Sequence, residues 1–234
     1  MNAVSVAKLW VRSFTQPHEA FKKERGNADY KLAFLNIIAA AVLATIIKLL
    51  VSVPTATMLG KQALVIAQFR TLGMPATTAL APENLLLLIS TNFLSILLLI
   101  LLGWAVGGAI TNKISQYLTG EGDLKTQLYL TSLFMPAFGI LGTILSFIGK
   151  TLIILPILSS SYQTFTGAFY AWAAVVVVFF LYNIRLYILA LAETHKYGEG
   201  AGLSSCIIGI IVLGIIFAIV AVTALGGFLN LLFI

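Results

Sequence analysis

The sequence predicts an all-α membrane protein, a polytopic bundle of about five transmembrane helices with an amphipathic helix at its N-terminus. The first observation is composition: 60% of the 234 residues are hydrophobic, only 9% are charged, and the mean hydropathy is +1.03. A soluble domain is about 45–50% apolar and about 25% charged. So large an apolar excess needs lipid as the solvent for much of the surface. The other two observations are the spacing of the apolar runs and the position of the basic residues.

Five apolar runs are each long enough to cross a hydrocarbon core of about 30 Å as a helix of about 20 residues. The predicted spans are residues 32–53, 84–110, 126–148, 168–192 and 203–225. Pro54 is expected to end the first span, and residues 197–202 are expected to form a glycine-rich turn before the fifth. The predicted domains are a cytoplasmic segment, 1–31, and a five-span membrane domain, 32–234.

The N-terminal segment has the pattern of an amphipathic helix over residues 3–14. Lys8 and Arg12 fall on one face at a spacing of four, and Trp10 lies among apolar residues on the rest of the surface. Basic residues combined with an aromatic ring are typical of a helix that lies in the plane of the membrane. We therefore expect Lys8, Trp10 and Arg12 at the membrane surface. The alternative is a helix packed on the protein's own loops.

The basic residues predict the orientation of the chain in the membrane. Six of the fourteen Lys and Arg residues lie within the first 31 positions. If the N-terminus is cytoplasmic, nine basic residues lie in inner segments and three in outer ones. The inner residues are Lys8, Arg12, Lys22, Lys23, Arg25, Lys31, Lys113, Lys125 and Lys196, and the outer ones are Lys61, Arg70 and Lys150. This asymmetry follows the positive-inside rule and, with five spans, places the C-terminus outside.

The sequence lacks the residue patterns of the common catalytic and cofactor sites. It has no GxSxG, HExxH or GxxxxGK[ST] motif, only two histidines (His18 and His195), and one cysteine (Cys206). No metal-ligand spacing is present. We expect no catalytic residue, no metal and no cofactor, and therefore no enzyme. Nucleic acid is not an expected partner, because the basic excess lies beside a membrane span.

Polar and small residues inside the spans suggest helix packing rather than ion transport. No Asp or Glu lies in a predicted span, which weakens the case for an ion-coupled transporter. Gly103 and Gly107 form a small-xxx-small pair that lets helices approach closely, within the monomer or in a homo-oligomer. Pro136 is expected to kink the third span.

Two polar cytoplasmic segments, residues 111–125 and 193–200, are the candidate partner-binding sites. In residues 119–123, the glycines are expected to permit positive φ angles, while Glu121 and Asp123 precede a helix start that favours negative charge. Glu193 and His195 lie at the exit of the fourth span. We predict that Glu121, Asp123, Glu193 and His195 contact a protein partner.

The order of these features resembles the Ypt-interacting-protein family of five-span membrane proteins, defined by the Yip domain. The resemblance covers about residues 13–225. It is carried by Pro17-His18-Glu19-Ala20-Phe21 before the first span, by Gly120-Glu121-Gly122-Asp123-Leu124, by Tyr129 followed by Pro136, and by residues 191–201 with His195. The sequence lacks the long acidic or proline-rich N-terminal region of eukaryotic members, and glycines stand at 198, 200 and 202 where the family more often has Ser or Lys before a small residue. The resemblance thus indicates a prokaryotic-type member.

The resemblance implies a non-enzymatic membrane scaffold or adaptor in the prokaryotic plasma membrane. Eukaryotic relatives are implicated in vesicle traffic and bind prenylated small GTPases and one another, so a small GTPase is a partner by resemblance alone. The expected partners are the lipid bilayer and an unidentified membrane or cytoplasmic protein. The alternative is a small permease, a lipid-handling protein or a subunit of a transport complex, which predicts a polar or lipid-sized cavity between the second, third and fourth spans.

Overall fold

The computed structural model describes residues 3–58, 82–118, 120–159 and 162–232 of the chain, and these residues form helices and short connections. The helices are α1 (Ala3–Thr15), α2 (Pro17–Glu24), the 3₁₀ turn η1 (Arg25–Asn27), α3 (Tyr30–Met58), α5 (Pro82–Tyr117), α6 (Leu124–Ser159), α7 (Tyr162–His195) and α8 (Glu199–Leu232). Within the described residues the fold is thus all-α, as the composition predicts.

Local sequence signals fix several helix starts. The backbone amides of Lys31 and Leu32 donate to Oδ1 of Asp29 at 2.6 and 3.1 Å, so Asp29 caps α3. Asp123 caps α6 in the same way, accepting the backbone amide of Thr126 at 2.7 Å. Pro17 occupies the first turn of α2, where a missing N–H costs nothing.

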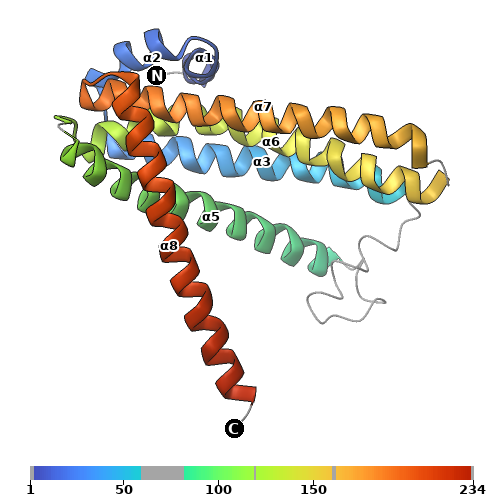
Figure 1. The fold of residues 1–234 in the computed structure, drawn as a ribbon. Coiled ribbons are helices and arrows are strands. Elements are labelled where there is room, and N and C mark those ends of the chain that lie inside the picture. The colour runs from blue at the N-terminus through green and yellow to red at the C-terminus, as the bar shows by residue number, and fades with distance from the viewer. Residues whose placement is uncertain (1–2, 59–81, 119, 160–161, 233–234) are drawn as a thin grey trace.

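Helices α3, α6 and α7 run side by side and form the centre of the molecule (Figure 1). Their contact surfaces bury large side chains completely, including Ile37 of α3, Leu130 and Leu133 of α6, and Leu186 of α7. Phe21 of α2 closes this core at one end, and its ring lies 6.2 Å from that of Phe134. The core therefore joins the membrane helices to the N-terminal segment.

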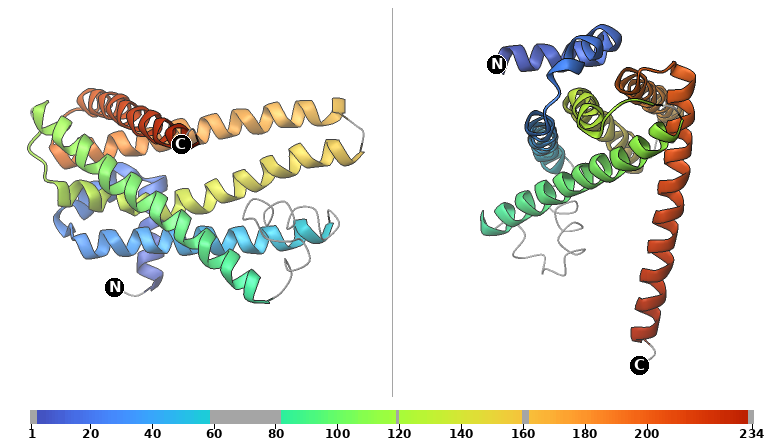
Figure 2. Two further views of the ribbon diagram at one scale, coloured as in Figure 1. Left: turned by 90° about the horizontal axis from the view of Figure 1, so that it is seen from below. Right: turned by 90° about the vertical axis from the view of Figure 1, so that its left-hand side faces the viewer.

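Helices α5 and α8 cross the three central helices instead of running parallel to them. Figure 2 shows α8 leaving the bundle at a steep angle, with its C-terminal half far from the other helices. The outer surfaces of these helices are apolar: Leu102 of α5 is 61% exposed and Ile211 of α8 is 56% exposed. Such side chains require lipid contact.

Five of the described helices have the length and hydropathy of membrane spans. They cover Tyr30–Lys48, Phe93–Tyr117, Leu124–Gly149, Thr166–His195 and Glu199–Ile216. Helix length and hydropathy thus confirm the prediction of about five transmembrane helices. The protein is a multi-pass integral membrane protein.

Two predicted helix boundaries are wrong. Helix α3 continues through Pro54 to Met58, although an interior proline removes one backbone hydrogen bond. The predicted glycine-rich turn at 197–202 is shorter, because α8 already begins at Glu199. Gly202 is helical and allows close packing: a Cβ atom there would lie 2.9 Å from the carbonyl oxygen of Ile188 in α7.

The predicted N-terminal helix forms and leans against the bundle. The indole Nε1 of Trp10 donates to Oδ1 of Asn36 in α3 at 2.9 Å, and Nδ2 of Asn36 donates to Oγ of Ser132 in α6 at 3.1 Å. Lys8 and Arg12 are exposed and line a groove between α1 and α2. Trp10 thus anchors α1 to the protein. The location of this helix at the membrane surface stays a prediction.

Candidate functional site: the polar end of the bundle

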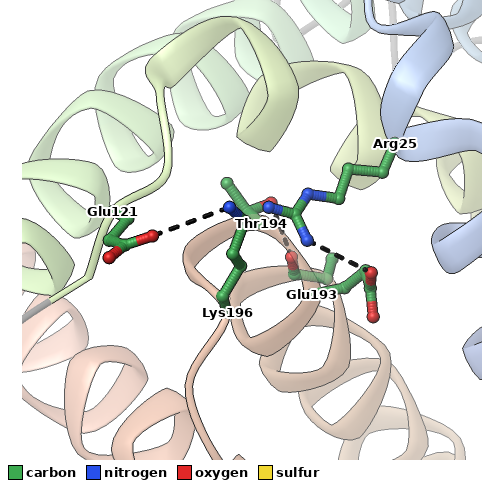
Figure 3. A network of polar contacts seen from close by, with 6 residues as sticks. Arg25, Glu121, Glu193, Thr194 and Lys196 are labelled. Carbon is green, nitrogen blue, oxygen red and sulfur yellow. Dashed lines mark hydrogen bonds and ion pairs between the residues drawn. The ribbon is translucent and has the colours of Figure 1, made fainter.

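Three separate parts of the chain meet at one end of the bundle, which we name the polar end. They are α2 with the turn η1, residues 120–123 between α5 and α6, and residues 193–199 at the junction of α7 and α8. Three ion pairs lie among them, two of which are drawn in Figure 3. The predicted partner-binding residues Glu121, Asp123, Glu193 and His195, which come from two distant segments, are all in this region.

The turn at 120–123 lies directly on the C-terminal end of α7. A Cβ atom on Gly120 would lie 2.6 Å from Nδ1 of His195, and one on Gly122 would lie 2.6 Å from the carbonyl oxygen of Thr194. Neither glycine has a φ angle in the left-handed region, so the expected reason for these glycines is wrong. Both are required by close approach of the backbone to α7, because any larger residue would push the turn away.

His195 lies beneath this turn and not on the surface. Its side chain is 1% exposed, and its carbonyl oxygen accepts the backbone amide of Glu121 at 3.3 Å. The imidazole stacks on the ring of Tyr197, with centroids 5.4 Å apart and an interplanar angle of 8°. His195 therefore supports the turn, and it would influence a partner only through that turn.

A buried chain of hydrogen bonds connects His195 to three helices. Its Nε2 lies 3.0 Å from Oε1 of Gln127 in α6, and Nε2 of Gln127 donates to Oγ1 of Thr111 in α5 at 2.8 Å. The hydroxyl of Thr111 lies 2.6 Å from that of Tyr187 in α7. Gln127 also donates to the carbonyl oxygen of Gly108 at 2.8 Å. This network fixes the relative positions of α5, α6 and α7 below the turn.

Above this network the acidic side chains are accessible. Glu121 is 75% exposed, and one of its carboxylate oxygens lies 3.6 Å from Nζ of Lys196, which is 57% exposed. Such exposed pairs contribute little to stability, about 0–1 kcal/mol. Lys196 has a φ of 56°, a conformation that marks the sharp reversal between α7 and α8. The turn therefore presents its carboxylate on a fixed backbone.

Asp123 combines accessibility with a structural role. Burial alone would raise the pKa of its carboxyl, but hydrogen bonds from Thr126 and the charge of Lys125 outweigh burial and lower the pKa below its usual value of 3.8. The carboxylate is thus ionised over the physiological range. A substitution at Asp123 changes both the surface charge and the start of α6.

Glu193, near the C-terminal end of α7, connects that helix to the N-terminal segment. Nη1 of Arg25 lies 3.6 Å from Oε1 of Glu193, and both side chains are about three-quarters buried. Nε2 of His18 lies 3.4 Å from Oε1 of Glu199 at a more exposed position. Tyr129, whose side chain is 2% exposed, donates to Oε2 of Glu24 at 3.0 Å. These contacts hold α2 against α6 and α7.

The predicted packing residues lie deeper in the membrane domain. Gly107 is buried, and a Cβ atom there would meet Leu213 of α8 at 3.6 Å, whereas one on Gly103 would meet nothing within 4 Å. Pro136 is buried within α6, which continues past it. Gly103 instead lines a cavity of about 320 Å³ between α5, α6, α7 and α8, which we name the intramembrane cavity.

Sequence reasoning missed the residues that organise the polar end. Thr111 and Gln127 lie in polar runs at the ends of α5 and α6, beside Asn112 and Thr126, and nothing in their spacing pairs them with His195. The signal that could have found them is their burial in a membrane span, where a polar side chain needs a partner. That signal predicts an interaction without naming the residue on the other helix.

The family model of the Yip1 domain matches residues 11–232. No curated protein and no solved structure matches the chain. The matched region contains the turn at 120–123, the junction at 195–199 and the five apolar helices. The chain therefore belongs to the Yip1 domain family of membrane proteins.

Proposed function

We propose that this protein is a non-enzymatic membrane adaptor that binds a protein partner through the polar end. The observation that carries the proposal is the carboxylate of Glu121, which is 75% exposed on a turn packed without a gap onto buried His195. A charged group on a fixed turn is suited to recognition, because the backbone that carries it does not have to be ordered on binding. Asp123 adds a second exposed carboxylate on the same turn, whereas Glu193 is about three-quarters buried against Arg25.

The charge distribution supports a location of this surface in the cytoplasm. Lys8, Arg12, Lys125 and Lys196 lie at or near the polar end, and an excess of basic residues marks the cytoplasmic side of membrane proteins. In a prokaryotic plasma membrane, the partner would be a cytoplasmic protein or another membrane protein. A small GTPase is the partner type that the family resemblance suggests.

The test is a quantitative pull-down from native membranes after mild cross-linking, with Glu121→Lys as the first variant. Partner retention should fall at least severalfold. In the double variant Glu121→Lys/Lys196→Glu, the side chains at positions 121 and 196 can again form an ion pair. The charge at position 121 is still the opposite of that in the wild type. If retention returns in the double variant, the carboxylate supports the local structure instead of recognising the partner.

A matched control is Lys113→Glu, which reverses an exposed charge in the last turns of α5 near the polar end. It should leave retention unchanged. Equal retention by wild type and Glu121→Lys would remove this surface from the proposal. Enrichment of the chain alone would show self-association, which would leave no separate partner for an adaptor.

A second candidate function, a lipid-handling protein or small permease, is favoured by the intramembrane cavity. This cavity involves the second, third and fourth spans, where the alternative expects one, and also the fifth. Its walls are mainly apolar, which suits a lipid better than a polar solute. Reconstitution in liposomes with a fluorescent-lipid transfer assay tests this candidate, since an unchanged transfer rate excludes it.

A further inference from the structure

A polar groove lies between α1 and α2, the two helices that precede the first span (Figure 1), and we name it the N-terminal groove. Its volume of about 410 Å³ falls within the usual range of ligand sites, about 300–1,000 Å³. Lys8 and Arg12 of α1 and Lys23 of α2 are among its lining residues. Lys8 and Arg12 share one face of α1, because residues four apart are neighbours on a helix surface. The groove therefore has basic side chains on both of its walls.

The basic side chains of the groove are exposed, and none of the three forms an ion pair with another described residue. Two carboxylates also line the groove, those of Glu19 and Glu24. Glu24 is already an acceptor, because its Oε2 receives the hydroxyl of Tyr129 at 3.0 Å and Nδ2 of Asn27 at 3.3 Å. The groove thus keeps an excess of positive charge that no described carboxylate neutralises by direct contact.

Both walls of the groove are held by the core of the protein. On α1, the indole of Trp10 donates to Asn36 of α3, and the hydroxyl of Tyr182 in α7 donates to the carbonyl oxygen of Phe14. On α2, Phe21 is completely buried in the core. The core therefore fixes the separation of the two walls, and the groove stays open without a ligand. A ligand would bind to a preformed site, which reduces the entropy lost on binding.

An exposed apolar stripe borders the basic wall of α1. Val4 is 62% exposed and Val11 is 59% exposed, and exposed Ala7 lies between them at helical spacing. Successive residues of a helix are about 100° apart, so this stripe lies next to Lys8 and Arg12. Charged side chains are costly in hydrocarbon, whereas apolar side chains gain from leaving water. Both stripes are accommodated together at the level of the lipid headgroups, where amphipathic helices bind.

We propose that the N-terminal groove binds the headgroup of an anionic membrane phospholipid, with the phosphate held by Lys8, Arg12 and Lys23. A guanidinium can donate two parallel hydrogen bonds to phosphate oxygens, and the ammonium groups add positive charge from both walls. The apolar stripe beside the groove directs the acyl chains of the same lipid toward the bilayer, which favours a lipid over a soluble phosphate. The inference extends the predicted location of α1 at the membrane surface and does not depend on the adaptor proposal.

The test is native mass spectrometry of the full chain in detergent micelles, titrated with dioleoylphosphatidylglycerol. This lipid should bind more tightly than dioleoylphosphatidylcholine, which has the same acyl chains but no net charge. Equal affinities would overturn selection by charge. Glycerol phosphate, added as a soluble competitor, should displace the lipid only at much higher concentration than the lipid itself. Displacement at equal concentration would identify a soluble phosphate as the ligand and would overturn the lipid.

Two neighbouring lysines distinguish a site from diffuse attraction to negative charge. Lys23→Gln removes a charge that lines the groove and should weaken the binding of phosphatidylglycerol about fivefold, the contribution of one basic residue at a membrane surface. Lys22→Gln removes the same charge from an adjacent exposed residue that does not line the groove, and the affinity should change by less than about twofold. Equal losses in the two variants would overturn the groove as the binding site.

The other charges of the groove predict effects of opposite sign. Lys8→Gln/Arg12→Gln should weaken binding by at least about tenfold, because two basic residues are lost. Glu19→Gln should strengthen it, because a negative charge near the phosphate is removed. Weaker binding in Glu19→Gln would show that this carboxylate holds an amine of the headgroup, and would overturn the assignment to an anionic lipid. These side chains are exposed, so each variant should unfold at the wild-type temperature, which thermal unfolding in micelles verifies.

Discussion

The imidazole of His195 and the backbone of Gly120 are in direct contact, so close that a Cβ atom at position 120 would lie 2.6 Å from Nδ1. This contact joins the end of α7 to the turn before α6, across a large separation in sequence. It explains why His195 is 1% exposed, although the sequence predicts that His195 contacts a partner. The stability and the position of the whole turn depend on it.

The first prediction concerns the close contacts of the turn. Gly120→Ala and Gly122→Ala should each destabilise the protein by about 1–3 kcal/mol, the usual cost of adding a group to a filled space. Unfolding in mixed detergent micelles measures this change. Gly198→Ala is the matched control, because a Cβ atom there would meet nothing within 4 Å. Equal effects at 120 and 198 would contradict the close contact.

The second prediction concerns the buried pair of His195 and Gln127. Gln127→Leu should cost about 1–3 kcal/mol, because it leaves Nε2 of His195 and the carbonyl oxygen of Gly108 without their partner. In a double-mutant cycle with His195→Ala, the coupling energy should be at least about 0.5 kcal/mol. Additive effects in the same unfolding experiment would show that the two side chains act independently.

The third prediction concerns the pH dependence of the cap of α6. Because the pKa of Asp123 is lowered in the folded protein, its contribution to stability is fully present above the ordinary value of 3.8 and is lost as the pH falls through the lowered value. Asp123→Asn keeps a capping oxygen but does not titrate. The stability of wild type relative to this variant should therefore decline only below about pH 4. A constant difference from pH 7 to pH 3 would rule out the ionised carboxylate as the source.

The fourth prediction concerns topology. A reporter fused after Ile234 should behave as external, and one fused before Met1 as cytoplasmic, because basic residues favour the cytoplasmic side and five spans separate the termini. Protease protection in sealed vesicles provides an independent measurement. Two cytoplasmic termini would be incompatible with five crossings.

Composition and apolar run length alone determined that the chain is helical, that it enters a membrane and that it has five spans, because these properties depend on the transfer of whole segments from water to lipid. The same local chemistry determined the helix starts at Asp29, Asp123 and Pro17. Patterns within one segment did not explain residues whose role is to contact a distant segment. Gly120, Gly122 and Gly202 all serve close approach to α7, and no pattern within their own segments shows that helix.

Only the tertiary structure decided which polar residues meet. The sequence predicted Glu121 and Asp123 in one partner-binding segment and Glu193 and His195 in another. The fold brings the two segments to the same end, buries His195 against Gln127 and leaves Glu121 accessible. The intramembrane cavity likewise depends on how α5 and α8 cross the central helices. Burial and pairing between helices are properties of their relative placement, which side-chain packing determines and the order of residues along one helix does not.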